Sequence, residues 1–242
     1  MTPKIYLALG DSITAGHGVT HPSLAFVRHV SDFAQKQLLA DRTVVIAKNG
    51  WTTKDILTAA NRISPGIWQQ TSLLTLMSGG NDLRKLLRRQ YLSLSGQPIS
   101  PTSVYKRLQE FGYHMDALCA HIAEQRIPHV IVATVYNPIP NFPLAVRAID
   151  ALNGIAREIA EHYDFTVVNV QKKFLTHEAY YIEGYKTGRF EDLMSPIRRP
   201  IHPNNAGHKR IADTITEHLA RDLATKTKRP RKKKRHATKT RI

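Results

Sequence analysis

The sequence has almost no cysteine, few acidic residues and no long apolar run. Cys119 is the only cysteine among 242 residues, so neither an intrachain disulfide nor a cysteine-based zinc site can form. No segment approaches the roughly 18 uninterrupted apolar residues of a membrane helix. The short apolar run near the N-terminus is not followed by a small-residue cleavage site, so no signal peptide is expected. The sequence therefore predicts a cytoplasmic protein, with non-classical export to a surface or coat left open.

The positive charge is concentrated at one end of the chain. Lysine and arginine total 35 against 19 acidic residues, which gives a net charge of +16. Residues 225–242 contain ten of these bases and no acid, which leaves a net charge of +6 for residues 1–224. Because the tail has almost no apolar content, we expect a disordered segment that follows one folded domain over residues 1–224.

The basic tail has two interpretations. It is either a solvated extension or an electrostatic tether to a polyanion such as a nucleic acid, an anionic membrane or a wall polymer. The tail has no aromatic residue to stack on bases. No specific reading of nucleic acid is therefore expected from it.

Short apolar runs alternate with longer amphipathic stretches along residues 1–224. Buried strands are predicted at 4–9, 43–47, 72–77, 129–135 and 165–170. Helices are predicted at 23–40, 53–63, 102–126, 143–163 and about 205–223. This alternation predicts an α/β fold of three layers, with a doubly wound, mainly parallel, five-stranded sheet in the middle. Two polar and aromatic stretches, 88–101 and 176–201, are predicted to cover the carboxyl end of the sheet.

Four short motifs fall where the predicted strands end and where the last helix begins. The first strand ends in Gly-Asp-Ser, which places the Ser12 hydroxyl at the carboxyl edge of the sheet. Asn-Gly, ending at Gly50, follows the second strand, and Gly-Gly-Asn-Asp, with Asn81 third, follows the next one. His202-Pro-Asn-Asn precedes the last helix, which either asparagine can cap. Each motif alone is an ordinary turn or cap, whereas their joint occurrence in this order indicates a site.

These four motifs resemble the blocks of the GDSL, or SGNH, esterase and lipase family. The resemblance spans residues 4 to about 223 and implies a flavodoxin-like sheet, which agrees with the periodicity. It implies that Ser12 supplies the nucleophile and one oxyanion-hole amide, that Gly50 supplies a second amide, and that the Asn81 side chain completes the hole. It places the general base on His202. It implies neither a metal nor an organic cofactor.

One position departs from the family pattern. The family has an aspartate three residues before the histidine, where this chain has Arg199. This departure leaves three alternatives. A backbone carbonyl or water orients His202, an acid from the preceding loop (Glu191 or Asp192) takes the role of the aspartate, or the site is inactive. The other site residues are all present, so an active enzyme is favoured.

The resemblance predicts a serine esterase or lipase that forms an acyl-enzyme on Ser12. The substrate is a small-molecule or lipid ester of undetermined acyl length. The alternative is a catalytically impaired or carbohydrate-deacetylating member of the family, tethered to a polyanion by its tail. Aromatic and apolar residues of the two unassigned stretches either line an acyl pocket or pack beneath a loop; they are Tyr91, Leu92, Leu94, Tyr180, Tyr181, Tyr185 and Phe190.

Overall fold

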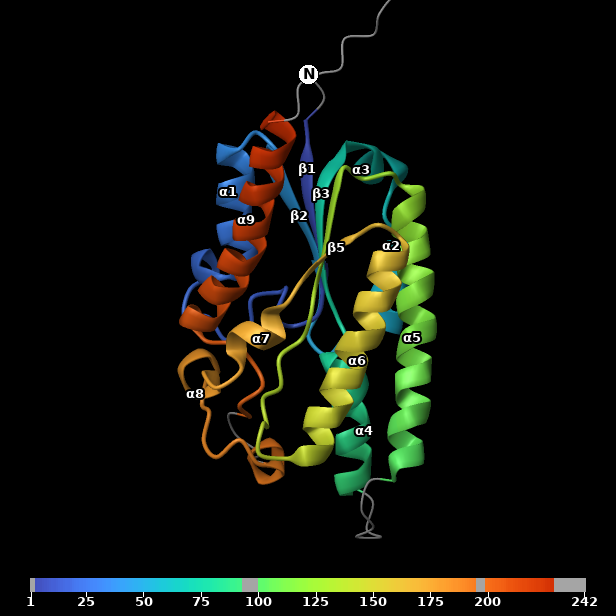
Figure 1. Ribbon diagram of the computed structural model, residues 1–242, viewed down its shortest axis with the longest axis vertical. Helices are drawn as coiled ribbons and strands as arrows, with labels where there is room; N and C mark the ends of the chain where they lie inside the picture. The colour runs from blue at the N-terminus through green and yellow to red at the C-terminus, as the bar shows by residue number, and fades with distance from the viewer. Residues whose placement is uncertain (1–2, 93–99, 195–198, 229–242) are drawn as a thin grey trace, which may run out of the picture.

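Five parallel strands form one sheet at the centre of the protein (Figure 1). The computed structural model describes residues 3–92, 100–194 and 199–228. The strands are β1 (Ile5–Gly10), β2 (Arg42–Ala47), β3 (Thr71–Met77), β4 (His129–Ala133) and β5 (Thr166–Val168). They pair in parallel in the order β2-β1-β3-β4-β5. The predicted fold class is confirmed, and every predicted strand overlaps an observed one.

Helices cover both faces of the sheet and make three layers (Figure 1). One face carries α1 (Phe26–Lys36) and α9 (Asn205–Lys228), which pack against each other. The other carries α2 (Thr53–Ala60), α4 (Gly80–Leu92), α5 (Pro101–Glu124) and α6 (Pro143–His162). The short helices are α3 (Pro65–Gln70), α7 (Val170–Phe174) and α8 (Glu178–Tyr181), with 3-10 turns η1 (Pro22–Leu24) and η2 (Phe190–Met194). Three helices begin with proline, whose fixed φ and missing N–H suit that position.

Several sequence-based boundaries are wrong. Helix α4 begins at Gly80 and includes residues 88–92, which were assigned to an irregular stretch. Gly-Gly-Asn-Asp is a common turn sequence, and that pattern concealed the start of the helix. Helix α9 continues to Lys228, so residues 225–228 of the predicted tail are helical, and the rest of the tail lies outside the described residues. The stretch 176–201 contains α8 and η2.

The strand order determines where in the sheet the site lies. From β1 the chain passes to β2 on one side, and β3 then pairs with β1 on the other side. In sheets of this kind a crevice opens at the carboxyl ends of the two strands where the winding direction reverses. All six residues of β1 are buried, as expected for a central strand. The motifs after β1, β2 and β3 therefore meet at one edge.

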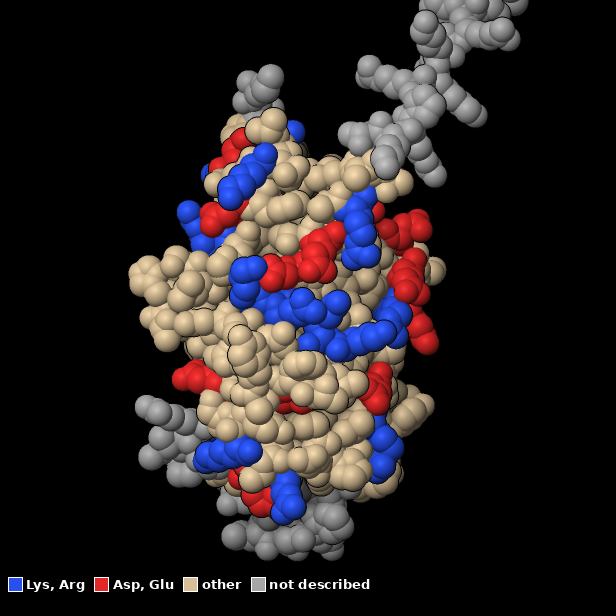
Figure 2. Space-filling view, turned by 60° about the vertical axis from the view of Figure 1, so that its left-hand side comes forward, with Lys and Arg blue, Asp and Glu red and all other residues tan. Residues whose placement is uncertain are grey.

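The surface carries charges of both signs. On the face drawn in Figure 2, which contains both basic and acidic side chains, Lys and Arg lie close to Asp and Glu in several places. This mixture agrees with the small net charge of residues 1–224. Among the helices of the described residues, none is both long and apolar enough to span a membrane.

Candidate active site

Ser12 lies in a tight turn directly after β1. The Asp11 carbonyl accepts a hydrogen bond from Ala15 N at 2.9 Å, and Asp11 Oδ1 accepts one from Ile13 N at 3.0 Å. Gly10, the last residue of β1, has no room for a side chain beside β3, because a Cβ there would lie 2.8 Å from the Met77 carbonyl oxygen. Ser12 itself is 5% exposed. The sequence thus fixes this hydroxyl at the carboxyl edge of the sheet.

His202 lies opposite Ser12, on the loop that precedes α9. Its Nε2 is 3.1 Å from Ser12 Oγ, although 190 residues separate the two in the chain. The loop is held by its backbone: Glu183 N donates to the His202 carbonyl at 2.9 Å, and Ile182 forms a β-bridge with Pro203. The structure therefore brings together the two residues that the sequence singled out.

Two further residues hold the loop of His202. Asn204 Oδ1 accepts a hydrogen bond from Gly207 N at 3.0 Å, which caps α9 as predicted. Tyr136, on the β4–α6 loop, donates from its hydroxyl to the Ile201 carbonyl at 2.7 Å. The Tyr136 ring stacks on Phe174 with centroids 4.4 Å apart. Tyr136 is thus a support of the site that the sequence analysis missed, since no local pattern marks it.

Two other histidines belong to the surroundings of His202. His208 is fully buried; its Nδ1 accepts from Phe26 N at 3.2 Å, and its Nε2 donates to the His17 carbonyl at 2.9 Å. Burial lowers the pKa of His208 to about 4, so the ring is neutral at pH 7. His17 in turn packs against His202, with ring centroids 5.4 Å apart. His17 is half-buried in this position.

The His202 ring is neutral at pH 7. The pKa of His202 is lowered to about 4. Burial of the ring is the largest cause, and the charges of His17 and Arg84 contribute to the same shift. A neutral Nε2 facing a serine hydroxyl is the state that a general base needs before reaction.

Neither predicted acid reaches the His202 ring. Asp192 accepts hydrogen bonds from Thr187 N and Gly188 N, both at 2.8 Å, and from Thr187 Oγ1. Although burial opposes its ionisation, these bonds lower the pKa of Asp192, which is committed to its own loop. Glu191 is exposed. Across the described residues, the only side-chain hydrogen bond of the His202 ring is the one to Ser12.

Gly50 and Asn81 lie at the same edge as Ser12. Gly50 has a φ of +80°, which favours glycine, and in the described ranges neither its N–H nor that of Ser12 donates to a protein acceptor. The Asn81 amide is engaged: Nδ2 donates to Asp11 Oδ2 at 3.1 Å and to the Trp51 carbonyl at 2.9 Å. Two backbone donors are thus available at the site, while the hydrogens of Asn81 already have partners.

The two aspartates of the motifs, Asp11 and Asp82, hold neighbouring segments together. Asp82 Oδ2 accepts hydrogen bonds from Thr53 N at 3.1 Å and Thr53 Oγ1 at 3.2 Å, which ties α4 to α2. Asp11 joins the turn after β1 to Asn81. Burial raises the pKa of Asp11 to about 6, and the Ile13 N–H and the Arg84 charge limit this rise. Asp11 is therefore mainly ionised at pH 7.

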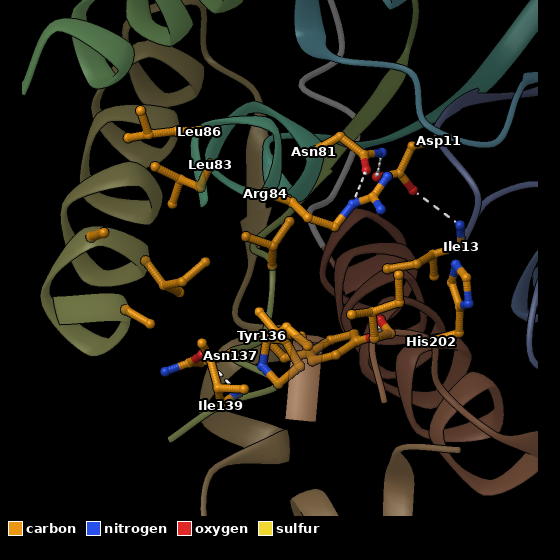
Figure 3. A pocket seen from close by; sticks show the side chains of 18 of the residues that line it. Asp11, Ile13, Asn81, Leu83, Arg84, Leu86, Tyr136, Asn137, Ile139 and His202 are labelled. Carbon is orange, nitrogen blue, oxygen red and sulfur yellow. Dashed lines mark hydrogen bonds between the residues drawn. The ribbon is translucent and has the colours of Figure 1, made fainter. Parts of the chain in front are cut away.

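An apolar pocket opens beside Ser12 and His202 (Figure 3). The polar residues Asp11, Ser12, Asn81, Arg84, Asn137 and His202 line it together with a larger apolar wall. That wall comes from the turn after β1, from α4, α5, α6, the β4–α6 loop and η2, and from the loop before α9. It consists of Ile13, Leu83, Leu86, Val104, Val135, Tyr136, Pro138, Ile139, Leu144, Ala145, Ala148, Ile149, Leu193 and Ile201. Among the described residues, no group of three or more His, Cys, Asp or Glu side chains could hold a metal ion.

Of the seven residues expected either to line an acyl pocket or to pack beneath a loop, the four whose side chains the structure describes do not line this pocket. Tyr181 and Tyr185 pack against the core, Tyr180 is exposed, and Phe190 packs on Phe142. The side chains of the remaining three, Tyr91, Leu92 and Leu94, lie outside the described part of the chain. Sequence reasoning missed the true wall because its residues come from helix faces, where apolar side chains have the pattern of ordinary core.

The fold and the site together define an ester-hydrolysing enzyme of the doubly wound α/β class. The model of the GDSL-like lipase/acylhydrolase family matches residues 8–210, and the chain belongs to this family. The spore germination lipase LipC of Bacillus licheniformis is 22% identical over 215 residues, which cover 87% of this chain and 93% of that protein.

Solved structures have the same fold. The lipase Lip_vut3 from a goat rumen metagenome matches with a TM-score of 0.71 and 22% identity, covering 88% of this chain and 96% of that one. Phospholipase A1 from Streptomyces albidoflavus NA297 matches with a TM-score of 0.63 and 18% identity, covering 89% and 99%. The acetylxylan esterase Axe2 from Geobacillus stearothermophilus matches with a TM-score of 0.61 and 20% identity, covering 90% and 94%.

Proposed function

We propose that the chain is a serine esterase that hydrolyses carboxylic esters through an acyl-enzyme on Ser12. The observation that carries the proposal is the 3.1 Å contact between His202 Nε2 and Ser12 Oγ at the mouth of an apolar pocket. A nucleophile within hydrogen-bond reach of a neutral base is the arrangement that activates a serine hydroxyl. The family membership supports the same chemistry.

The reaction proceeds in two steps. His202 Nε2 takes the Ser12 proton while Oγ forms a bond to the ester carbonyl carbon, and the carbonyl oxygen becomes an oxyanion. When the intermediate collapses, the C–O bond to the alcohol breaks and His202 returns the proton to the leaving oxygen. A water molecule, deprotonated by the same ring, then attacks the acyl-enzyme and releases the acid and Ser12. The backbone amides of Ser12 and Gly50 face the oxyanion; losing one donor of this kind typically costs about 10²–10³ in turnover.

Ser12 and His202 act as a catalytic pair, without a carboxylate that hydrogen-bonds the imidazole ring. A triad aspartate fixes the imidazole tautomer and stabilises the imidazolium. In this protein the orientation of His202 depends on its held backbone, the His17 contact and the Ser12 hydrogen bond. We therefore expect a slower enzyme than one with a complete triad, and one whose base stays neutral in mild acid.

The pocket favours an ester with an apolar acyl group over an acetylated sugar. The structural neighbours include both a phospholipase A1 and an acetylxylan esterase, so the fold alone does not decide the substrate. The wall beyond Ser12 is mainly apolar, with Asn137 on the β4–α6 loop as a polar exception, which suits a hydrocarbon chain and gives a sugar hydroxyl few partners. Burying each methylene contributes about 0.8 kcal/mol.

Labelling and hydrolysis assays test the function. A fluorophosphonate should label wild-type protein at Ser12 alone, and Ser12→Ala should lose both labelling and p-nitrophenyl ester hydrolysis. A wild-type protein that is folded, unlabelled and inactive on the whole ester panel would show that the site is inactive. Full activity in Ser12→Ala would contradict the nucleophile assignment.

Acyl length is tested by narrowing the pocket. Ala148 lines the pocket on α6, whereas Ala151, three residues further along the same helix, is exposed. Ala148→Phe should lower kcat/KM for octanoyl and longer esters about tenfold or more and leave acetyl ester hydrolysis within about threefold, since the added ring occupies the chain site. Ala151→Phe is the matched control and should leave the ratio unchanged. Equal losses on both esters in Ala148→Phe would contradict the acyl assignment.

A further inference from the structure

His17 contacts the base from outside the pocket. It lies on the loop between β1 and η1, and its ring packs against the His202 ring with centroids 5.4 Å apart and planes tilted by 52°. His202 lines the pocket, at the margin of the side chains drawn in Figure 3, whereas His17 does not line it. The His17 ring therefore supports the base without bordering the space proposed for the acyl group.

The backbone of His17 is fixed at both of its polar groups. Its N–H donates a hydrogen bond to the Ser12 carbonyl at 2.9 Å, and its carbonyl accepts one from His208 Nε2 at 2.9 Å. His208 is fully buried on α9, and its Nδ1 accepts a hydrogen bond from Phe26 N at 3.2 Å. The loop of His17 is thus attached both to the residue that carries the nucleophile and to the helix that follows the base.

Two neighbours of His17 attach the same loop to the residues that follow His202. Asn205, the first residue of α9, accepts a hydrogen bond on Oδ1 from Thr20 N at 3.0 Å and donates from Nδ2 to Thr20 Oγ1 at 2.9 Å. The two backbones are also in close contact, because a Cβ on Gly18 would lie 2.1 Å from the Pro203 carbonyl oxygen. The fold therefore sets the distance between the two histidine rings.

The reaction needs such a support while the proton is on the base. Before the reaction, the hydrogen bond to Ser12 Oγ directs the His202 ring. Once Oγ is bonded to the acyl carbon, the protonated Nε2 has to donate to the leaving oxygen, so Ser12 no longer orients the ring. A triad aspartate supplies the orientation in that state, but within the described residues no carboxylate hydrogen-bonds this ring. The orientation then depends on packing.

We propose that His17 is a positioning residue that keeps the His202 ring oriented for proton transfer through the contact between the two rings. The inference rests on the proposed esterase function. A ring packed against an imidazole limits the rotamers open to it, and a displacement of about 1 Å at a catalytic group can cost about 10²-fold in rate. His17 thereby takes the orienting part of the task that the family assigns to the aspartate at position 199.

The contact and the charge of His17 act on the base in different ways. The charges of His17, Arg84 and His208 add to burial in lowering the pKa of His202. A phenylalanine at position 17 keeps an aromatic ring against His202 but carries no charge. This one substitution therefore separates the contact from the charge.

The test compares His17→Ala and His17→Phe with His21→Ala. His21 is the matched control, because it is an exposed histidine of the same loop and contacts neither the pocket nor the His202 ring. On a p-nitrophenyl ester, His17→Ala should lower kcat about 10–100-fold with KM changed less than about threefold, since the acyl site is intact. His17→Phe should keep kcat within about threefold of wild type, and His21→Ala should match wild type.

Two further readouts distinguish positioning from a loss of stability. The rate of fluorophosphonate labelling of Ser12 should fall in His17→Ala about as much as kcat does, because labelling needs the same proton transfer to His202. In His17→Phe the acid limb of the pH–rate profile should move to higher pH, because the His17 charge no longer lowers the pKa of His202. Thermal unfolding of each variant measures any change in stability separately.

The variants also define what would overturn the proposal. Wild-type-like kcat and labelling in a folded His17→Ala would overturn it, and so would equal losses in His17→Ala and His17→Phe, because the ring contact would then not be the cause. If His17→Ala does not fold, His17→Asn decides in the same way, since its shorter side chain also removes the ring contact. A wild-type protein that neither hydrolyses esters nor reacts with a fluorophosphonate would instead contradict the proposed function.

Discussion

The two halves of the site are held in different ways. On the nucleophile side, buried and partly buried side chains bond to one another across three strand ends: Asp11 bonds to Asn81, Asn81 to Arg84, and Asp82 to Thr53. On the base side, the backbone of the loop is held at several points, but the His202 ring has a single hydrogen bond in the described part of the chain.

This difference shows which contacts each half depends on. The nucleophile side is a network of charged and polar groups in a buried place, where each member satisfies another, so removing one leaves buried partners without a bond. The base side depends on the fit of a loop against its neighbours and on burial of the ring. We expect substitutions that move the loop of His202 to affect catalysis without unfolding the sheet.

Replacing the base should have the largest effect. His202→Ala should lower kcat/KM by about 10⁴-fold or more, because no other side chain in the described ranges hydrogen-bonds Ser12 to take its proton. Some activity above the uncatalysed rate should remain, since the oxyanion donors are intact. His162→Ala, on the exposed end of α6, is the control and should match wild type. The measurement is kcat/KM, with circular dichroism as the check on folding. A kcat/KM of His202→Ala within tenfold of the wild-type value would contradict the assignment of His202 as the base for Ser12.

Moving the loop without touching the ring should have the next largest effect. Gly18 has a φ of +98°, and a Cβ there would lie 2.1 Å from the Pro203 carbonyl oxygen and 3.0 Å from His202 Cβ. Gly18→Ala should push the two loops apart, strain the backbone by about 1–3 kcal/mol, and lower kcat about 10–100-fold.

Gly154→Ala is the matched control for this change. Gly154 lies inside α6 with no atom within 4 Å of the added Cβ, so the substitution should stabilise the protein by about 0.5–1 kcal/mol and leave activity unchanged. The test measures thermal unfolding and kcat on both variants. Normal kcat in Gly18→Ala would show that the loop of His202 tolerates displacement.

The pH dependence of activity should show the buried base. Because burial lowers the pKa of His202 to about 4, the ring stays neutral, and kcat/KM should stay level as pH falls from 7 and decline only near pH 4. An unshifted imidazole would give a decline near pH 6.5. Asp11, whose pKa is about 6, titrates between these limits, so Asp11→Asn is measured in parallel to separate the two groups. An acid limb near 6.5 in both proteins would contradict the buried base.

The sequence predicted what is local and periodic. The strands, the order of the four blocks and the caps followed from patterns of a few residues, and they place Ser12, Gly50, Asn81 and His202 at one edge. The partners of these residues did not follow, because they depend on contacts between distant segments. Asp192 lies in the segment that precedes His202 and was therefore a candidate acid, yet its carboxylate accepts hydrogen bonds from its own loop.

Arg84 and Tyr136 show the same limit from the other side. Arg84 lies on α4, a helix that was not predicted because its first residues, Gly-Gly-Asn-Asp, are typical of a turn. The i, i+3 relation of Asn81 and Arg84 was therefore not apparent. Tyr136 bonds to a carbonyl 65 residues away, which no spacing rule identifies. In both cases the sequence identified the residues of the site but not the residues that hold them in place.

The smallest expected effect concerns Arg199, which stands three residues before His202 where the family has an aspartate. Arg199 is exposed, and its carbonyl accepts a hydrogen bond from Ile201 N at 2.8 Å. Arg199→Asp should raise kcat/KM a few-fold and move the acid limb to higher pH, because a carboxylate beside the ring accepts a hydrogen bond from Nδ1–H and stabilises the imidazolium. The nucleophile side should be unaffected, so fluorophosphonate should still label Ser12.

Arg199→Gln separates the two causes of that change. It removes the positive charge without supplying a carboxylate, so it should raise kcat/KM less than Arg199→Asp does. If the two variants gain equally, the removed charge is what matters, and the added acid does not reach the ring. A large loss in a folded Arg199→Asp would mean that the arginine has a task of its own, such as binding an anionic group of the substrate at the mouth of the pocket. The base side would then have exchanged a catalytic acid for a recognition residue.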